Sequence, residues 1–492
     1  MTDTPPPGPA EQSSLAEQPG PDEPAEPARP LPLVDAGAAF TEPLPETRRE
    51  LAHRVAVCQA TGRAPALVAT VVRAGAPVWS GGAGELPAGV RPERVRFRIG
   101  SITKTLTAVL VLRLRDEGLV ELDQPVGRWL PTPHAGGATV AQLLAHAGGL
   151  AAEARGPWWE RTPGELRPEL PDIFGPEPAK HPAGRRFHYS NPGYALLGAL
   201  VERLRGEPWF TVLRREVLVP LGMADTSYAA GEPAVRGWAV HPHADLRQPE
   251  PAVDTGRMAP AGQLWSTTED LGRLAGFLLD GDEAVLGAAS LAEMRAPAVP
   301  PEPTDWQTVY GLGLQVARED GRLLVGHGGS MPGFLAGLWL DPEQRTAAAV
   351  LANATSGPGV RALARELLAT LRRREPTFPA PWRPAADADR RLLPLTGSWF
   401  WGTSGYVLRL GAAGAVSLTP AVAGGRGSDF RRVADERWIG LDGYFAGETL
   451  AVHRAPDGRV THLDLGTFVF TREPYDPGAP VPGGADPAGW TA

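Results

Sequence analysis

Cysteine and lysine are the scarcest reactive residues in this chain of 492 residues. Cys58 is the single cysteine, so no disulfide can form within the chain, and we expect it to be a small buried residue. Lysine occurs only at Lys104 and Lys180, and arginine supplies the remaining basic residues. In a chain that uses arginine almost everywhere, each lysine that remains is informative.

Long apolar runs and an excess of positive charge are also missing. No stretch approaches the roughly 20 apolar residues that span a bilayer, and no signal peptide is visible at the start. The net charge of −8 gives no general attraction to nucleic acid or to anionic membranes. We therefore expect a cytoplasmic protein whose partner is a small molecule rather than nucleic acid or a membrane. The oligomeric state stays open.

Proline and charged residues gather at both ends of the chain and in one internal stretch, where little apolar surface is available for packing. We expect a disordered acidic tail at residues 1–35, a second tail at 474–492 and a linker at 376–391. A large domain then covers residues 45–375. A smaller domain covers 392–473, where short alternating runs separated by turns predict a small β-barrel of lipocalin-like type.

The large domain begins and ends with predicted strands and has helices between them. A hairpin is expected over residues 67–82, and apolar spacing predicts a helix over 101–117. Further strands are expected at 322–326, 334–340 and 346–353, and further helices at 139–146, 192–205, 268–279 and 359–373. This order favours an α+β fold, with an antiparallel sheet flanked by helices and a helical subdomain.

Ser101 and Lys104 lie three residues apart at the start of the predicted helix 101–117, so they share a helix face. A serine hydroxyl becomes a good nucleophile only when a base removes its proton. A lysine amine can be that base where burial favours its neutral form. The alternative is an N-cap serine followed by a surface lysine.

A second motif consists of Tyr189 and Asn191, ahead of the predicted helix 192–205. A tyrosine can pass a proton to a leaving group, and an asparagine can orient a substrate amide. A packed tyrosine beside an N-cap asparagine is the alternative interpretation.

A third motif, His327, Gly328, Gly329 and Ser330, closes a predicted strand. Adjacent glycines allow a substrate backbone to lie close to a strand edge. The backbone N–H of Ser330 could form an oxyanion hole together with that of Ser101. A histidine held by structural hydrogen bonds is the alternative for His327.

In this order the three motifs resemble the penicillin-recognising serine hydrolases, in the branch of class C β-lactamases, D-aminopeptidases and esterases. The segments VAQLLAHAGGL and AGQLWSTTEDLGRL also resemble that family. The resemblance implies a nucleophile at Ser101, a general base at Lys104 and a proton shuttle at Tyr189. It implies substrate contacts at Asn191, His327, Gly328, Gly329 and Ser330.

The resemblance also implies a serine hydrolase that works through an acyl-enzyme without metal or cofactor. One departure bears on its substrate, because β-lactam-processing members have Lys-Thr-Gly where this chain has His327-Gly328-Gly329. A neutral histidine and a glycine provide neither a fixed cation nor a hydroxyl, so an ester or an amide of a D-amino acid is expected. A true β-lactamase and an idle ligand-binding protein remain the alternatives, and an arginine from elsewhere could restore an anion site.

Overall fold

The computed structural model describes residues 42–131, 135–162, 169–300, 307–376, 382, 384–385 and 387–475. The predicted tail at 1–35 lies outside these ranges, as do residues 476–492 of the second tail, and the predicted linker is described only in part. The chain forms two compact units, Met1–Phe378 and Pro379–Ala492. Within the described ranges, no helix is long and apolar enough to cross a membrane.

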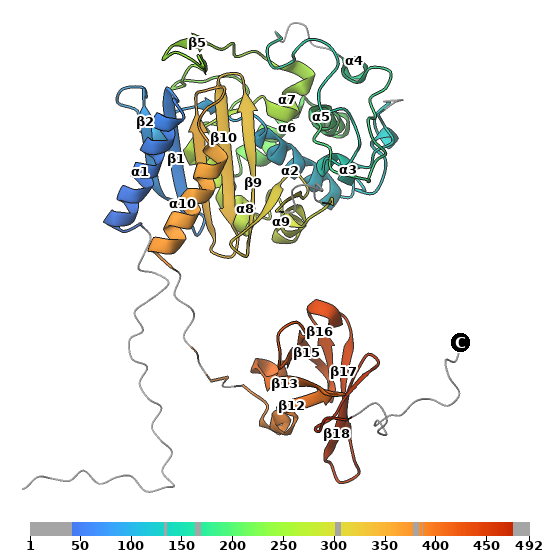
Figure 1. Ribbon diagram of the computed structural model, residues 1–492. Coiled ribbons are helices and arrows are strands. Elements are labelled where there is room, and N and C mark those ends of the chain that lie inside the picture. Colours follow the sequence, from blue (N-terminus) through green and yellow to red (C-terminus); the bar gives the residue numbers. More distant parts are fainter. Residues whose placement is uncertain are drawn as a thin grey trace, which may run out of the picture. The chain divides into compact units, whose positions relative to one another are not determined.

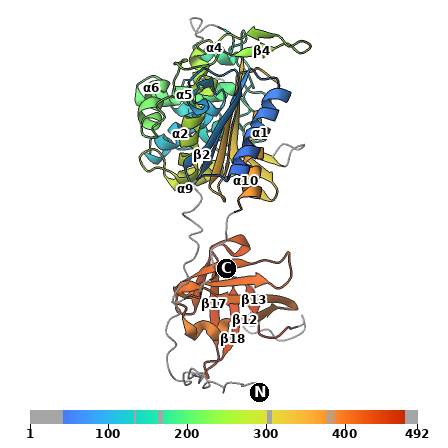
Figure 2. The same ribbon diagram turned by 90° about the vertical axis from the view of Figure 1, so that its left-hand side faces the viewer.

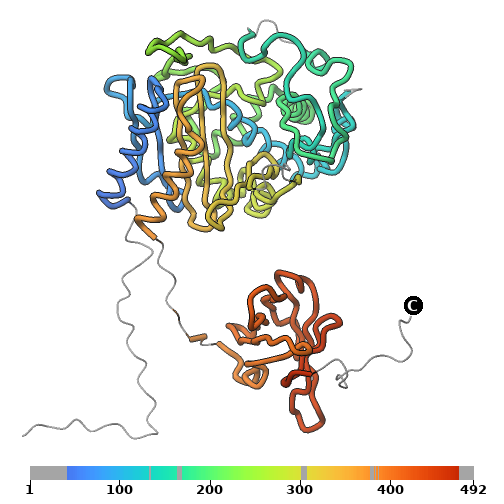
Figure 3. The backbone as a smooth tube through the Cα atoms, viewed as in Figure 1, coloured from blue at the N-terminus to red at the C-terminus, as the bar shows by residue number. Residues whose placement is uncertain are grey.

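The first unit is built on a seven-stranded sheet in the order β2-β1-β11-β10-β9-β8-β7, with every neighbouring pair antiparallel. The strands are β1 (Ala66–Arg73), β2 (Ala76–Gly84), β7 (Thr308–Tyr310), β8 (Gln315–Glu319), β9 (Arg322–Met331), β10 (Phe334–Asp341) and β11 (Thr346–Ala352). The hairpin of β1 and β2 thus joins the last strands of the first unit, because β1 pairs with β11, as the blue and orange tubes of Figure 3 show. The predicted antiparallel sheet with helices is confirmed.

Helices cover both faces of this sheet (Figures 1 and 2). One face carries α1 (Pro45–Thr61) and α10 (Val360–Arg374), and the other carries α2 (Ile102–Asp116) and α8 (Thr268–Asp280). The remaining helices are α3 (Val140–Leu144), α4 (Leu170–Phe174), α5 (Asn191–Arg205), α6 (Trp209–Leu213), α7 (Ala259–Gly262) and α9 (Ala288–Arg295), and a π-helical turn follows α6 at Arg214–Leu218. Two short ribbons complete the unit, β3 (Phe97–Arg98) with β6 (Trp265–Ser266) and β4 (Trp238–Val240) with β5 (Arg247–Pro249).

The central helix α2 is buried on nearly all sides, from Ile102 through Leu112. It lies between the sheet and α5, so apolar residues occupy more than one face of the helix. The residue before Ser101, Gly100, has a φ of +51°, a backbone conformation that favours glycine. A tight turn therefore delivers Ser101 to the start of a helix that the core holds rigidly.

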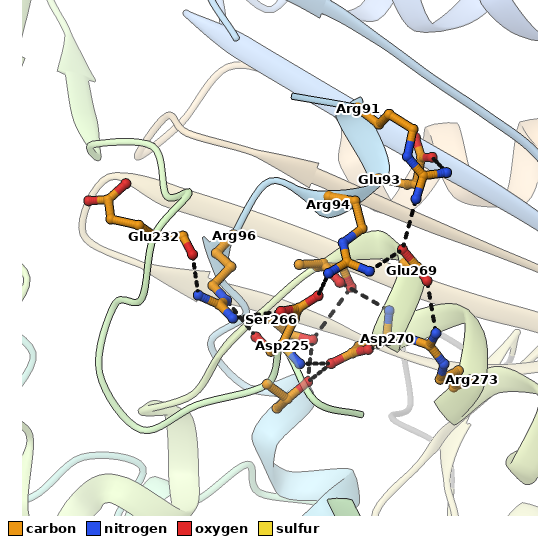
Figure 4. Close-up of polar contacts among 12 residues, drawn as sticks. Arg91, Glu93, Arg94, Arg96, Asp225, Glu232, Ser266, Glu269, Asp270 and Arg273 are labelled. Atoms are coloured by element: carbon orange, nitrogen blue, oxygen red, sulfur yellow. Dashed lines mark hydrogen bonds and ion pairs between the residues drawn. The ribbon is translucent and has the colours of Figure 1, made fainter. Parts of the chain in front are cut away.

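A network of charged and hydroxyl groups joins the loop at Asp225 and Thr226 to β6 and α8 (Figure 4). Asp270 is completely buried, and its carboxylate accepts hydrogen bonds from Thr226 Oγ1 at 2.9 Å and from the backbone N–H of Asp225 at 2.9 Å. Arg273 donates to the same carboxylate at 2.6 Å. The network anchors the chain shortly after Ala261, a residue whose carbonyl oxygen accepts a hydrogen bond from Lys104.

The second unit is an eight-stranded antiparallel sheet, β12 to β19 in sequence order. The strands are β12 (Gly397–Trp401), β13 (Ser404–Leu410), β14 (Val416–Pro420), β15 (Ser428–Ala434), β16 (Arg437–Gly440), β17 (Thr449–Arg454), β18 (Val460–Leu465) and β19 (Phe468–Phe470). Phe400 and Thr471 exchange backbone hydrogen bonds, so the first strand meets the residue after the last and the barrel nearly closes. Trp399 and Trp438 are fully buried in its core. The predicted small β-barrel is confirmed.

Candidate active site

Ser101 and Lys104 meet at the start of α2. Lys104 Nζ lies 2.9 Å from Ser101 Oγ and donates a hydrogen bond to the Ala261 carbonyl at 2.6 Å. The Ser101 side chain makes no capping bond to its helix, and Lys104 is completely buried. Ser101 therefore occupies the N-cap position of α2 without capping the helix, and Lys104 is a buried lysine rather than a surface lysine. This arrangement places an amine where it can take the hydroxyl proton.

Burial lowers the pKa of Lys104 from 10.5 to about 7, because the charged ammonium loses its hydration. The carboxylates of Glu153 and Glu160 oppose this effect and keep the pKa from falling further. A substantial fraction of the amine is therefore neutral near pH 7 and has a lone pair that can accept a proton.

Tyr189 lies beside this pair. Lys104 Nζ is 5.0 Å from the centroid of the Tyr189 ring. Burial raises the pKa of the Tyr189 phenol well above 10, although a hydrogen bond with the Ser101 side chain opposes that shift. The phenol is thus protonated at neutral pH and is a hydrogen-bond donor rather than a base.

Asn191 is the first residue of α5, not part of a preceding loop, and the N-cap is Ser190, whose Oγ accepts from the Gly193 N–H at 3.1 Å. Asn191 Nδ2 donates to Glu153 Oε1 at 2.9 Å. Because its amide N–H group bonds that carboxylate, its carbonyl oxygen is the group suited to accept from a substrate amide.

His327 is buried in β9, and protein groups engage both ring nitrogens. Nδ1 lies 2.5 Å from the Gly328 carbonyl, and Nε2 lies 2.6 Å from the Tyr310 hydroxyl. A carbonyl can only accept, so Nδ1 carries the proton and Nε2 accepts from Tyr310. Burial lowers the pKa of His327 to about 3, with a further contribution from the Lys104 charge. His327 is therefore neutral at pH 7 and supplies no cation.

The backbone of β9 lies directly against the turn that carries Ser101. A Cβ atom on Gly329 would be 2.0 Å from the Ile99 carbonyl oxygen, and one on Gly100 would be 2.6 Å from the Ser330 nitrogen. Only glycine permits this approach at both positions. The backbone nitrogens of Ser101 and Ser330 consequently belong to segments in direct contact.

A hollow of about 840 Å³ opens beside Ser101. The predicted site residues Tyr189, His327, Gly328, Gly329 and Ser330 also line it, whereas Asn191 is not among its lining residues. Two further residues, Tyr310 and Arg361, line the hollow but were not expected from the sequence. Neither residue belongs to a motif, so position in the fold is the signal that identifies them.

His146, from the segment VAQLLAHAGGL, packs against Tyr189 and holds the backbone next to it. Its ring stacks on Tyr189 with centroids 4.0 Å apart, and its Nδ1 accepts the Ser190 N–H at 3.0 Å. Its φ of +56° is uncommon for a residue with a side chain, so the surrounding packing holds a costly backbone conformation. Burial lowers the pKa of His146 well below 6.5, which leaves the imidazole neutral.

Residues 51–373 match the Beta-lactamase family. The chain belongs to that family. The barrel matches a second family at residues 388–472, a domain of unknown function named DUF7586.

Two named relatives and a solved structure are similar to this chain. Penicillin-binding protein 4 of Amycolatopsis lactamdurans is 31% identical over 330 residues, which are 62% of this chain and 84% of that protein. Esterase EstB of Burkholderia gladioli is 32% identical over 286 residues, 54% of this chain and 65% of the esterase. The D-amino acid amidase of Ochrobactrum anthropi SV3, in complex with L-phenylalanine, superposes with a TM-score of 0.56 at 25% identity, covering 67% and 99% of the two chains. The family thus includes serine hydrolases that are esterases and amidases.

Proposed function

We propose that this protein is a serine hydrolase that cleaves an ester or an amide through an acyl-enzyme on Ser101. The observation that carries the proposal is the buried Lys104 amine, 2.9 Å from Ser101 Oγ with a pKa of about 7. Neutral Lys104 takes the Ser101 proton while Oγ attacks the substrate carbonyl carbon. The proton now on Lys104 is the one that the leaving group needs.

The backbone N–H groups of Ser101 and Ser330 stabilise the oxyanion that forms on the carbonyl oxygen. The tetrahedral intermediate collapses as the bond to the leaving group breaks. Tyr189, protonated and close to Lys104, relays a proton to the departing oxygen or nitrogen and is replenished from Lys104. A water molecule then attacks the acyl-enzyme while Lys104 takes its proton. The bond between the acyl carbon and Ser101 Oγ breaks, and the proton returns from Lys104 to Ser101 Oγ as the acid is released. The Asn191 carbonyl oxygen accepts from an amide N–H in the acyl group.

The direct test is covalent labelling with a fluorophosphonate, followed by intact-mass spectrometry. We expect one adduct on the wild-type protein and none on Ser101→Ala, together with a loss of p-nitrophenyl butyrate hydrolysis on the order of 10³-fold or more in that variant. Activity of Ser101→Ala within tenfold of wild type would refute the assignment. A folded wild-type protein that neither labels nor hydrolyses esters would support the ligand-binding alternative.

A β-lactamase is the second candidate, and the observation that favours it is Arg361, a cation in the hollow beside Ser101. Hydrolysis of nitrocefin at a higher kcat/KM than p-nitrophenyl butyrate would select this candidate. We expect the ester to be the better substrate, because neither His327 nor Gly328 offers the cation and hydroxyl that β-lactam-processing relatives present on this strand.

A further inference from the structure

The side of the site at Asn191, proposed above to bind the acyl group, is covered by the chain itself. The hollow beside Ser101 does not include Asn191 among its lining residues, and only 8% of the Asn191 surface is exposed. The backbone N–H of Asn191 donates to the Ala152 carbonyl at 2.9 Å, and its side chain donates to Glu153. The segment that begins at Ala152 therefore lies over the acyl side of the site.

Trp159 belongs to the same segment and lies against the turn before α2. A Cβ atom built on Gly262 would be 3.7 Å from Trp159 Cη2 and 3.7 Å from the Gly100 carbonyl carbon. The indole N–H donates to Glu153 Oε2 at 2.8 Å, and the other oxygen of this carboxylate accepts from Asn191 Nδ2 at 2.9 Å. One carboxylate thus holds both the Trp159 ring and the Asn191 amide.

Further contacts keep the segment in this position. Arg161 donates to Glu250 at 2.6 Å, and Glu250 is buried. The Trp159 ring packs against an apolar cluster whose buried members are Ile173, Ala195 and Met258. The ring is therefore a fixed wall, because moving it aside would break its hydrogen bond and its apolar contacts.

We propose that Trp159 limits the length of the acyl group, so that the enzyme cleaves esters or amides of short carboxylic acids. The proposal rests on the hydrolase function above and narrows its substrate class. The acyl chain of the acyl-enzyme begins at Ser101 Oγ and extends towards Asn191, where the Trp159 ring occupies space. A short chain ends before the ring, whereas a longer chain would have to displace it.

Truncation of Trp159 should convert this wall into an apolar subsite. The cluster behind the ring would then receive the methylene groups of a longer acyl chain. Burial of one methylene group favours binding about fourfold. The change leaves Ser101, Lys104 and Tyr189 in place, so it should alter the choice of acyl group rather than the chemistry.

The test compares p-nitrophenyl hexanoate with p-nitrophenyl acetate, two esters with the same leaving group. The ratio of their kcat/KM values measures the preference for the longer acyl group and is independent of enzyme concentration. The acetate should be the better substrate of the wild type. We expect Trp159→Ala to raise the ratio about fivefold or more, because burial of two further methylene groups is sufficient for that change.

Trp158→Ala is the matched control, because this adjacent tryptophan is 58% exposed and its indole N–H donates to Glu160. It should change the ratio less than about twofold, as a surface substitution does. A wild type that prefers the hexanoate, a rise below about fivefold in Trp159→Ala, or an equal rise in Trp158→Ala would overturn the length limit.

Trp159→Leu keeps an apolar side chain of intermediate volume and serves if the alanine variant does not fold. Its ratio should rise about twofold or more, and a smaller rise would overturn the proposal. Failure of the hydrolase function is separately visible, since Ser101→Ala would then still cleave both esters.

Discussion

Ester hydrolysis should rise about tenfold between pH 6 and pH 8, because Lys104 acts as a base only when neutral. With a pKa of about 7, the amine is roughly one-tenth neutral at pH 6 and nine-tenths neutral at pH 8. The neighbouring groups do not obscure this step. Burial holds the pKa of His327 near 3 and that of His146 well below 6.5, and it raises the pKa of Tyr189 well above 10.

The measurement is kcat/KM for p-nitrophenyl butyrate, which reports the pKa values of the free enzyme. Product should be read at a wavelength where p-nitrophenol and its anion absorb equally. Glu160→Gln gives a directional control, because the Glu160 charge raises the pKa of Lys104 and its removal should move the midpoint to lower pH. A profile that is flat from pH 6 to pH 8, or a midpoint near 10, would refute Lys104 as a buried base.

The same pKa predicts how folding stability depends on pH. In the unfolded chain the amine has its ordinary pKa of 10.5, so between pH 7 and pH 10.5 unfolding takes up a proton. The contribution of Lys104 to stability should therefore rise with pH in this window, by up to about 1.4 kcal/mol per pH unit, and be flat below pH 7. Urea denaturation of wild type and Lys104→Met at several pH values isolates this contribution. A stability difference that does not change with pH would contradict it.

Three further substitutions test the roles of individual buried side chains. Lys104→Arg should be inactive towards p-nitrophenyl butyrate, because a guanidinium keeps its proton, and appreciable turnover would reduce Lys104 to an electrostatic role. His146→Phe leaves the Ser190 N–H without its acceptor and should lower the free energy of unfolding by about 1–3 kcal/mol in urea denaturation. Asp270→Ala leaves the Thr226 hydroxyl and the Asp225 N–H unpaired and should cost roughly 2–4 kcal/mol by the same assay. An unchanged urea midpoint in either of the last two variants would show that the hydrogen bond concerned contributes little.

Much of the first unit could be predicted, because its core elements bury apolar residues with regular spacing. The hairpin of β1 and β2 and the helices α2, α5, α8 and α10 were expected within a few residues of their observed bounds. Helix α1 was not, because only Thr47, Leu51 and Val55 are buried along its length. The short edge strand β7 was also missed, since three residues give no periodicity to read.

In the candidate site, too, contacts between residues close in sequence could be predicted, and contacts made by the tertiary fold could not. Ser101 and Lys104 are close in sequence, so helical geometry alone predicts their contact. Tyr310 and Arg361 reach the hollow through the sheet and through α10, and no local pattern marks them. The sequence could suggest a base for Ser101 but not its pKa, because the pKa depends on a burial that only the packed core provides.

The third motif illustrates why a substrate class inferred from local residues needs the rest of the fold. The expectation that the site lacks a fixed cation was based on His327 and Gly328 alone. The low pKa of His327 agrees with that expectation, because the ring is neutral at pH 7. However, the absence of a side chain at Gly328 is what allows the Arg361 stem to cross β9. A glycine in place of a hydroxyl residue therefore removes one possible anion ligand from β9 and leaves room for the stem of an arginine beside the strand. For this reason the comparison of nitrocefin with p-nitrophenyl butyrate tests whether Arg361 serves in place of the cation that His327 does not provide.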